Sequence, residues 1–366
     1  GSRRSRSSSR ASASAVGAAG DAGHARDPSD NVRDPMLRMK RSADGRLVAG
    51  SMCMRDDAGP MSWTDGVEGC DFQVRSKGYK DSSSSQYKEK VTSEVPFYTL
   101  EGVDCTRTEK CVTEIGDKVV LPAWFTEGEA AREARGEVAG PLPRMLVVNV
   151  ALPLYSTWTG SQTDGPSAHK FMYFRLRDEY ADQMMDEAVR SYAMLALSLS
   201  RTCFGAFACL RACVYGGVAH LPSSLPSHHQ TAPAGLQLLI RFFKLASNNR
   251  DAAPLLKIIM MIDNIDELGL PSMVNKYNGK PALQRSAQVL ERDGYFEILI
   301  NVHIWAQMVR ALWARYRGLF AGHHLRVGLL VEGNDETELP EQMMLAVALH
   351  QMDWDAFPKD VITPRP

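Results

Sequence analysis

Hydrophobic residues along the chain gather in short blocks whose spacing predicts a mixture of strands and helices. Short alternating or continuous apolar runs bounded by turn residues are typical of strands. The expected strands are residues 71–75, 95–100, 118–121, 145–152, 171–176, 255–262, 294–303, 325–333 and 344–349. Because a loop rich in Gly, Asp and Ser joins blocks 145–152 and 171–176, we expect these two to pair as neighbours.

Apolar positions three and four residues apart predict helices that begin near residue 178 and that cover residues 236–245 and 304–317. The last helix carries its apolar residues on one face and its arginines on the other. The apolar face comprises Trp305, Met308, Val309, Leu312 and Trp313, and the polar side Arg310, Arg315 and Arg317. A core helix with a charged outer face is the first interpretation, and contact of Trp305, Trp313 and the arginines with anionic lipid is the alternative.

The order of these elements predicts an α+β fold. The strands are separated by helices of uneven length and joined by turn signals, which favours a largely antiparallel sheet flanked by helices over a doubly wound sheet. We expect one large domain over residues 60–357, preceded by a head over residues 1–50 and followed by a tail over residues 358–366.

The head has a distinct composition. Residues 1–35 hold almost no large apolar side chain, so burial cannot offset their ordering entropy, and we expect a head that is disordered or held by a partner. Its first twenty residues contain four Arg, seven Ser and no acid, the composition of a transit peptide for a plastid or mitochondrion. A flexible tail explains the same composition equally well.

An apolar helical insertion is expected at about residues 180–221. From Tyr192 to Leu221 the only charged side chains are Arg201 and Arg211. They divide the run into pieces of about ten residues, shorter than the ~18 that a membrane span needs. We therefore expect a helix buried in the fold or docked on a partner, with Arg201 and Arg211 as candidate contacts.

Charge and cysteine content narrow the function classes. The 42 basic and 43 acidic residues leave a net charge of −1, so we expect no nucleic-acid partner. Seven cysteines without zinc-type spacing predict neither a disulfide framework nor a metal site and favour an intracellular reducing compartment. We find no nucleotide-binding motif, so no cofactor is predicted.

Catalytic motifs are also missing from the sequence. Ser167 lies in a polar Gly-Pro-Ser segment without the second glycine of a nucleophile elbow, and we interpret it as a loop serine. His303 is interpreted as a hydrogen-bonded histidine at a strand end, and a hydrolase that pairs it with Glu297 or Glu332 is the weakest alternative. The acidic run from Glu332 to Glu341 is interpreted as a solvated turn, and the histidine pairs at 228–229 and 323–324 as loop residues.

Several short words in this order resemble a known family, the C-terminal domain of the plant protein Enhanced Disease Resistance 2. The resemblance covers about residues 60–357. The words are Trp63 followed by residues 72–79 (FQVRSKGY), 102–104 (GVD), 147–153 (VVNVALP), 277–283 (YNGKPAL), 295–298 (YFEI), 301–303 (NVH), 331–333 (VEG) and 338–341 (ELPE). The family positions that these words supply are Arg75, Asn149, Asn278, Gly279, Lys280, Glu297, His303 and Glu338.

The resemblance implies a regulatory module associated with a membrane or lipid and implies no established reaction. We therefore expect a non-catalytic binding module, peripheral to a membrane. An accessory structural subunit of a large organellar membrane assembly, photosynthetic or respiratory, is the alternative, and subunits of such a complex would then be its partners. Asn278 and Gly279 suit a tight turn as well as a site, and Glu338 suits a helix cap.

Overall fold

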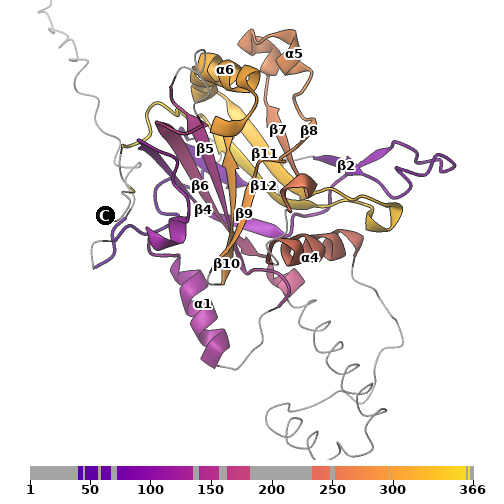
Figure 1. Cartoon of the computed structure of the whole chain (residues 1–366), viewed down its shortest axis with the longest axis horizontal. Helices are drawn as coiled ribbons and strands as arrows, with labels where there is room; N and C mark the ends of the chain where they lie inside the picture. Colours follow the sequence, from indigo (N-terminus) through magenta and orange to yellow (C-terminus); the bar gives the residue numbers. More distant parts are fainter. Residues whose placement is uncertain are drawn as a thin grey trace, which may run out of the picture. The chain divides into compact units, whose positions relative to one another are not determined.

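Two five-stranded sheets share one hydrophobic core (Figure 1). The computed structural model describes residues 40–43, 46–56, 59–66, 72–134, 140–155, 163–181, 233–247, 252–292, 294–359 and 362. Most of the predicted head, most of the predicted insertion at 180–221 with Arg201 and Arg211, the His228–His229 pair and most of the tail lie outside these residues.

The first sheet has the strand order β4-β6-β5-β10-β9. Its strands are β4 (Tyr98–Thr108), β5 (Met145–Pro153), β6 (Ser167–Leu176), β9 (Gln288–Arg292) and β10 (Tyr295–Asn301). β5 and β6 pair antiparallel as predicted, while β5 and β10 run parallel. Both faces of β5 and β6 are covered, which explains their nearly continuous apolar sequence.

The second sheet has the order β1-β12-β11-β7-β8, and all its neighbours are antiparallel. Its strands are β1 (Ser62–Asp65), β7 (Leu256–Ile262), β8 (Pro281–Leu283), β11 (His324–Val331) and β12 (Met343–His350). A hairpin of β2 (Gln73–Arg75) and β3 (Lys90–Thr92) covers part of the outer face of this sheet with Phe72 and Val74.

Helices complete the fold. The α-helices are α1 (Ala123–Ala134), α4 (Ala234–Ser247), α5 (Ser272–Asn275) and α6 (Gln307–Tyr316). The 3-10 helices are η2 (Ile115–Asp117), η3 (Ala253–Leu255), η4 (Ile265–Leu268), η5 (Val302–Ile304), η6 (Arg317–Gly322) and η7 (Glu336–Glu338). The predicted α+β class with mainly antiparallel sheets is confirmed.

The predicted strand at 118–121 is wrong. Lys118 ends η2, and Val120 makes only an isolated bridge with Val48. Helix α1 was not predicted. The strand predicted at 95–100 is too short, since β4 continues through Asp104 to Thr108.

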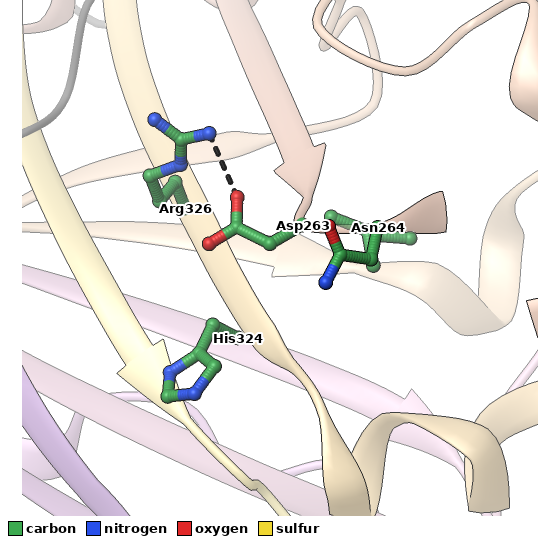
Figure 2. Close-up of a pocket in the computed structure, with 5 residues that line it drawn as sticks. Asp263, Asn264, His324 and Arg326 are labelled. Atoms are coloured by element: carbon green, nitrogen blue, oxygen red, sulfur yellow. Dashed lines mark hydrogen bonds and ion pairs between the residues drawn. The ribbon is translucent and has the colours of Figure 1, made fainter. Parts of the chain in front are cut away.

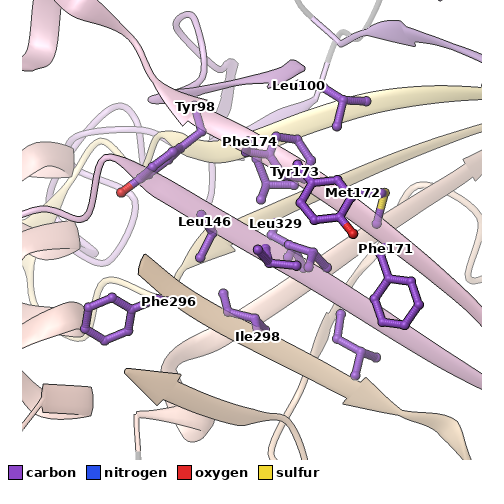
Figure 3. Packing of buried hydrophobic residues seen from close by; sticks show 14 of the residues in the cluster. Tyr98, Leu100, Leu146, Phe171, Met172, Tyr173, Phe174, Phe296, Ile298 and Leu329 are labelled. Atoms are coloured by element: carbon purple, nitrogen blue, oxygen red, sulfur yellow. The ribbon is translucent and has the colours of Figure 1, made fainter. Parts of the chain in front are cut away.

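Aromatic packing joins the parts of the core. Figure 3 shows Leu329 of the second sheet among Leu146, Phe174 and Ile298 of the first. Phe243 of α4 reaches the same core, with its ring centroid 6.4 Å from that of Tyr98 and 4.9 Å from that of Phe296. α4 therefore packs against two strands of the first sheet and also contacts β11 of the second.

A buried carboxylate holds the segment before β1 on the edge of the first sheet. Asp104 of β4 accepts hydrogen bonds from the backbone nitrogens of Gly50, Ser51 and Met52 at 2.6, 3.0 and 3.0 Å. The close approach requires glycine, because a Cβ at Gly102 would lie 2.5 Å from the Gly50 Cα. Burial raises the pKa of Asp104 to about 6, although these backbone donors oppose the shift.

We expect Phe243→Ala to lower the free energy of unfolding by about 3–5 kcal/mol, because the ring is 1% exposed and its loss leaves a cavity between α4 and the sheets. Denaturant titration measures the change. Ser247→Ala, at the exposed last residue of α4, is the control and should stay within about 0.5 kcal/mol of the wild type. A loss under 1 kcal/mol for Phe243→Ala would contradict the role given to α4.

Candidate functional site

Four charged side chains, three from separate family words and one from β7, meet on the outer face of the second sheet. Lys257 Nζ lies 3.1 Å from both Glu332 Oε1 and Glu341 Oε1. The Arg75 guanidinium donates to Glu341 and lies 3.5 Å from Glu332. The Glu341 side chain is 2% exposed, so the expectation of a solvated acidic turn is wrong for this residue.

The two cations balance the two carboxylates, and this balance makes burial possible. Burial alone would favour the protonated form of Glu341, but the Arg75 hydrogen bond and the Lys257 charge outweigh it and lower its pKa. The Gly333 backbone nitrogen also donates to Glu341, at 3.0 Å. Glu341 is thus ionised at neutral pH, and the two cations and the Gly333 backbone nitrogen stabilise its charge.

The same cluster fastens the β2–β3 hairpin. Glu336 accepts from the backbone nitrogens of Gly78 and Lys80, and Lys80 Nζ donates to the carbonyl oxygens of Gly333 and Asn334. Together with the four charged side chains, these contacts form what we call the hairpin clamp. Its four charged side chains come from three of the family words and from β7, and the clamp holds a hairpin in place.

A second polar network, the loop clamp, holds residues 112–115 against the first sheet. Glu297 accepts from Ile115 N at 2.9 Å and from Asn149 Nδ2 at 3.0 Å, and Asn149 Nδ2 also donates to Val112 O at 2.8 Å. Val112 N donates to His169 Nε2 at 3.0 Å. Nε2 is therefore the acceptor nitrogen of His169, and Nδ1–H donates to Asn149 Oδ1 at 3.0 Å.

Burial sets the protonation of this network. It lowers the pKa of His169 to about 3, which agrees with the neutral ring that the hydrogen bonds require. It raises the pKa of Glu297, although the bond from Asn149 opposes the shift. Asn149 and Glu297, two of the family positions, therefore serve the attachment of a loop.

The third family position in this region, His303, contacts Ser167. The Ser167 hydroxyl lies 2.6 Å from Gly165 O and 2.9 Å from His303 Nε2, and Tyr155 OH lies 2.9 Å from His303 Nδ1. Since the serine has one proton and a carbonyl accepts it, His303 Nε2–H donates to Ser167 and Nδ1 accepts from Tyr155. Burial lowers the pKa of His303, in keeping with a neutral ring.

Ser167 is the first residue of β6 and fully buried, so the expectation of a loop serine is wrong. His303 lies in η5, two residues beyond the end of β10, and is also fully buried. Of the two carboxylates considered as its partners, Glu297 belongs to the loop clamp and Glu332 to the hairpin clamp. In this arrangement the hydroxyl proton of Ser167 faces Gly165, as in a structural contact.

The remaining family positions also have structural partners. The Asn278 amide bonds both backbone groups of Ile262, at 2.8 and 3.0 Å, and Gly279 adopts a φ of +69°. Lys280 follows in the same turn before β8. Glu338 completes a capping box with Asp335 and forms an ion pair with Arg241 of α4.

Helix α6 is rotated relative to the predicted orientation. Arg310 is its buried residue, whereas Met308 and Val309 are 59% and 38% exposed. Trp313 is half-buried: its Nε1 donates to Pro153 O at 3.0 Å, and its ring stacks on Phe320. Residues 310 and 313 share a face, so the helix packs through this arginine and tryptophan and turns its Met308 side outward.

The other candidate contacts near α6 also differ in exposure. Trp305 packs partly buried against the core. Arg317 lies 3.2 Å from Asp355, and Arg315 is exposed. Arg310 is therefore buried and Trp305, Trp313 and Arg317 are partly buried, whereas Arg315 is exposed.

Residues 304–319 carry four exposed apolar side chains. All four have exposed fractions of 38% or more and come from η5, α6 and η6. They are Ile304, Met308, Val309 and Leu319, and we call them the α6 ridge. The sequence does carry one signal for this surface, because residues 302–331 contain four arginines and no acid.

Lys170 is a buried amine that the sequence analysis missed. It is 1% exposed and pairs across the strands with Cys105. Its Nζ lies 4.1 Å from the Trp354 ring centroid and has no hydrogen-bond partner among the described residues. Burial lowers its pKa to about 8.

Among the residues that the structure describes, no three His, Cys, Asp or Glu side chains are grouped so that they could hold a metal ion. Among the helices of the same residues, none is both long and apolar enough to cross a membrane.

The fold and these networks define a two-sheet α+β domain whose buried polar residues attach loops and a hairpin to the sheets. Residues 63–353 match the family described as Protein ENHANCED DISEASE RESISTANCE 2, C-terminal. The chain belongs to this family, which confirms the resemblance seen in its short sequence words. No curated protein and no solved structure matches the chain.

We expect Glu341→Gln to lower the free energy of unfolding by about 3–5 kcal/mol at pH 7, because it leaves the two cations Arg75 and Lys257 facing the single carboxylate of Glu332. Since the folded pKa of Glu341 lies below 4.5, its contribution is present above that pH and is lost as the pH falls further. Chemical denaturation at several pH values measures both effects. Glu291→Gln, at an exposed position, is the control, and equal losses in the two variants would contradict the hairpin clamp.

We expect Lys170→Met to stabilise the protein at pH 7, by up to about 3 kcal/mol, because it removes a buried ammonium group. The folded pKa of about 8 lies below the ordinary 10.5, so wild-type stability should rise between these values and the advantage of the variant should shrink. Urea titrations at pH 7, 9 and 10.5 test this. Lys90→Met is the exposed control, and a pH-independent difference would refute the assignment.

Proposed function

We propose that this domain is a non-catalytic module that binds the surface of a membrane containing anionic lipids through the α6 ridge. The observation that carries the proposal is the outward orientation of Ile304, Met308, Val309 and Leu319. Exposed large apolar side chains that gather in one place are typical of an interaction surface. A membrane interface accepts such side chains at the boundary between headgroups and acyl chains.

Charge supports an anionic membrane as the partner. Arg315 lies two helical turns beyond Met308, on the same exposed side of α6. Arg317 follows in η6, and the absence of acidic residues from 302–331 leaves the ridge segment with a positive formal charge. Each arginine near an anionic leaflet contributes about 1 kcal/mol to binding.

The orientation of α6 supports a surface role for the ridge. Burying Arg310 while exposing Met308 reverses the arrangement that hydrophobicity alone favours. Trp313 and Phe320 supply the apolar contact that seats the helix, so its second apolar side is left for another partner. A module of this kind needs no reacting group, and Ser167, His303 and Glu297 keep the structural partners described above.

We expect the double substitution Met308→Ser and Val309→Ser to weaken binding to vesicles of phosphatidylcholine and phosphatidylserine by tenfold or more. The reason is the loss of apolar area that the membrane would bury, about 25 cal/mol for each Å². Arg315→Ala should weaken binding about fivefold and reduce its dependence on salt. Co-sedimentation over a range of vesicle concentrations measures both.

Met260→Ser is the matched control, because Met260 is 43% exposed but lies on β7, away from the ridge. It should bind vesicles as the wild type does. Equal binding by all variants would reject the ridge as the membrane contact. If vesicles bind none of the proteins and the native chain sediments in a large complex, the ridge is a protein interface and the accessory-subunit hypothesis replaces this proposal.

A further inference from the structure

Two histidines face each other across the second sheet. His324, the first residue of β11, pairs in register with His350, the last residue of β12. Their Nδ1 atoms lie 2.6 Å apart, and the two rings meet nearly edge to face with centroids 4.8 Å apart. The pairing of the two strands fixes both backbones and so keeps the two Nδ1 atoms close to each other.

A contact between two ring nitrogens can hold only one proton. If both rings are neutral, one Nδ1 donates its hydrogen and the other accepts it. The accepting Nδ1 directs its lone pair at the shared hydrogen, and the donating ring presents a lone pair at the same place when its proton lies on Nε2 instead. Replacing that proton with a metal ion would use both lone pairs.

The spacing suits this replacement. Two imidazole nitrogens bound to one tetrahedral zinc at about 2.0–2.1 Å each lie about 3.3 Å apart. The observed Nδ1–Nδ1 distance of 2.6 Å therefore needs to open by only about 0.7 Å, a small rotation of two side chains. The backbone pairing of β11 and β12 does not have to change.

A neighbouring strand orients one of the two rings. Thr64 Oγ1 of β1 lies 3.1 Å from His350 Nε2. Metal-binding histidines commonly use their second nitrogen in such a contact, which fixes the ring orientation. The pair therefore has a supporting hydrogen bond of the kind that a ligand pair requires.

A surface hollow lies beside His324. His324 lines a hollow of about 610 Å³ together with Ile262, Asp263, Asn264 and Arg326 (Figure 2). Asp263 forms an ion pair with Arg326 at 2.7 Å, so its charge is balanced within the hollow. The hollow admits a hydrated ion, and water can fill the positions that two protein ligands leave open.

We propose that His324 and His350 bind one divalent transition-metal ion. Imidazole ligands favour zinc, nickel and copper over magnesium and calcium. No third side chain of a ligand type joins them within the described residues, so the site is an open, two-histidine site completed by water. The bound ion would tie the start of β11 to the end of β12, and ligation of the folded state would raise the stability of the domain.

The test uses the full chain with His228→Gln and His229→Gln as background, because that adjacent pair could bind metal independently. After treatment with a chelator, calorimetric titration with Zn²⁺ should show one equivalent bound. His324→Gln and His350→Gln should each weaken binding at least tenfold, and Thr64→Val about tenfold. His323→Gln, whose Nδ1 lies 2.7 Å from Leu319 O, is the matched control and should bind as the background does.

A second measurement does not depend on whether the variants fold. Electron paramagnetic resonance of the background protein with one equivalent of Cu²⁺ should show coupling to two nitrogens. A signal from one nitrogen or from none overturns the proposal. Unchanged zinc affinity in both histidine variants overturns it as well, as does a loss of affinity in His323→Gln equal to theirs.

Discussion

Three buried carboxylates, Asp104, Glu297 and Glu341, determine how the irregular parts of this domain lie on its two sheets. Each accepts at least one hydrogen bond from a backbone nitrogen of a segment that is distant in sequence. A buried carboxylate is costly unless donors or cations surround it, so the loop and the strand each require the other. The three sites satisfy this condition differently: Asp104 with three backbone donors, Glu297 with one amide and one backbone donor, and Glu341 with two cations.

This constraint explains which features were predictable from the sequence. Strands β5, β6, β7, β10, β11 and β12 and helix α4 bury long apolar runs, and periodicity located them. The second half of β4 was missed because Asp104 and Arg107 interrupt its apolar pattern, although Asp104 is fully buried. Val119 and Val120 resemble a strand, but the segment packs as an irregular stretch after η2. From a single sequence, a buried polar residue that a distant partner stabilises cannot be distinguished from a surface residue.

The family positions show that one sequence also does not reveal which residues form a functional site. Order and wording identified the family, but the words alone did not separate site residues from structural ones. Arg75 and Glu332 are separated by most of the chain and meet in the hairpin clamp, and Asn149 meets Glu297 in the loop clamp. Ser167 and His303 are 136 residues apart and form a contact that sequence spacing could not indicate. The direction of their hydrogen bonds, from Tyr155 through His303 to Ser167 and Gly165, then follows from the single proton of each donor.

Helix α6 combines a predictable element with an orientation that depends on its neighbours. The amphipathic pattern predicted the helix. The assumption that its whole apolar side faces the core predicted the orientation incorrectly. The assumption failed because the core side of α6 is occupied by Trp313, which donates to Pro153 and packs on Phe320 and Trp354. Once that large ring fixes the helix, residue 310 must lie inward on the same side, and residues 308 and 315 must lie outward. An apolar side chain on that outward face has no core left to enter, and this geometric consequence leaves Met308 of α6 exposed.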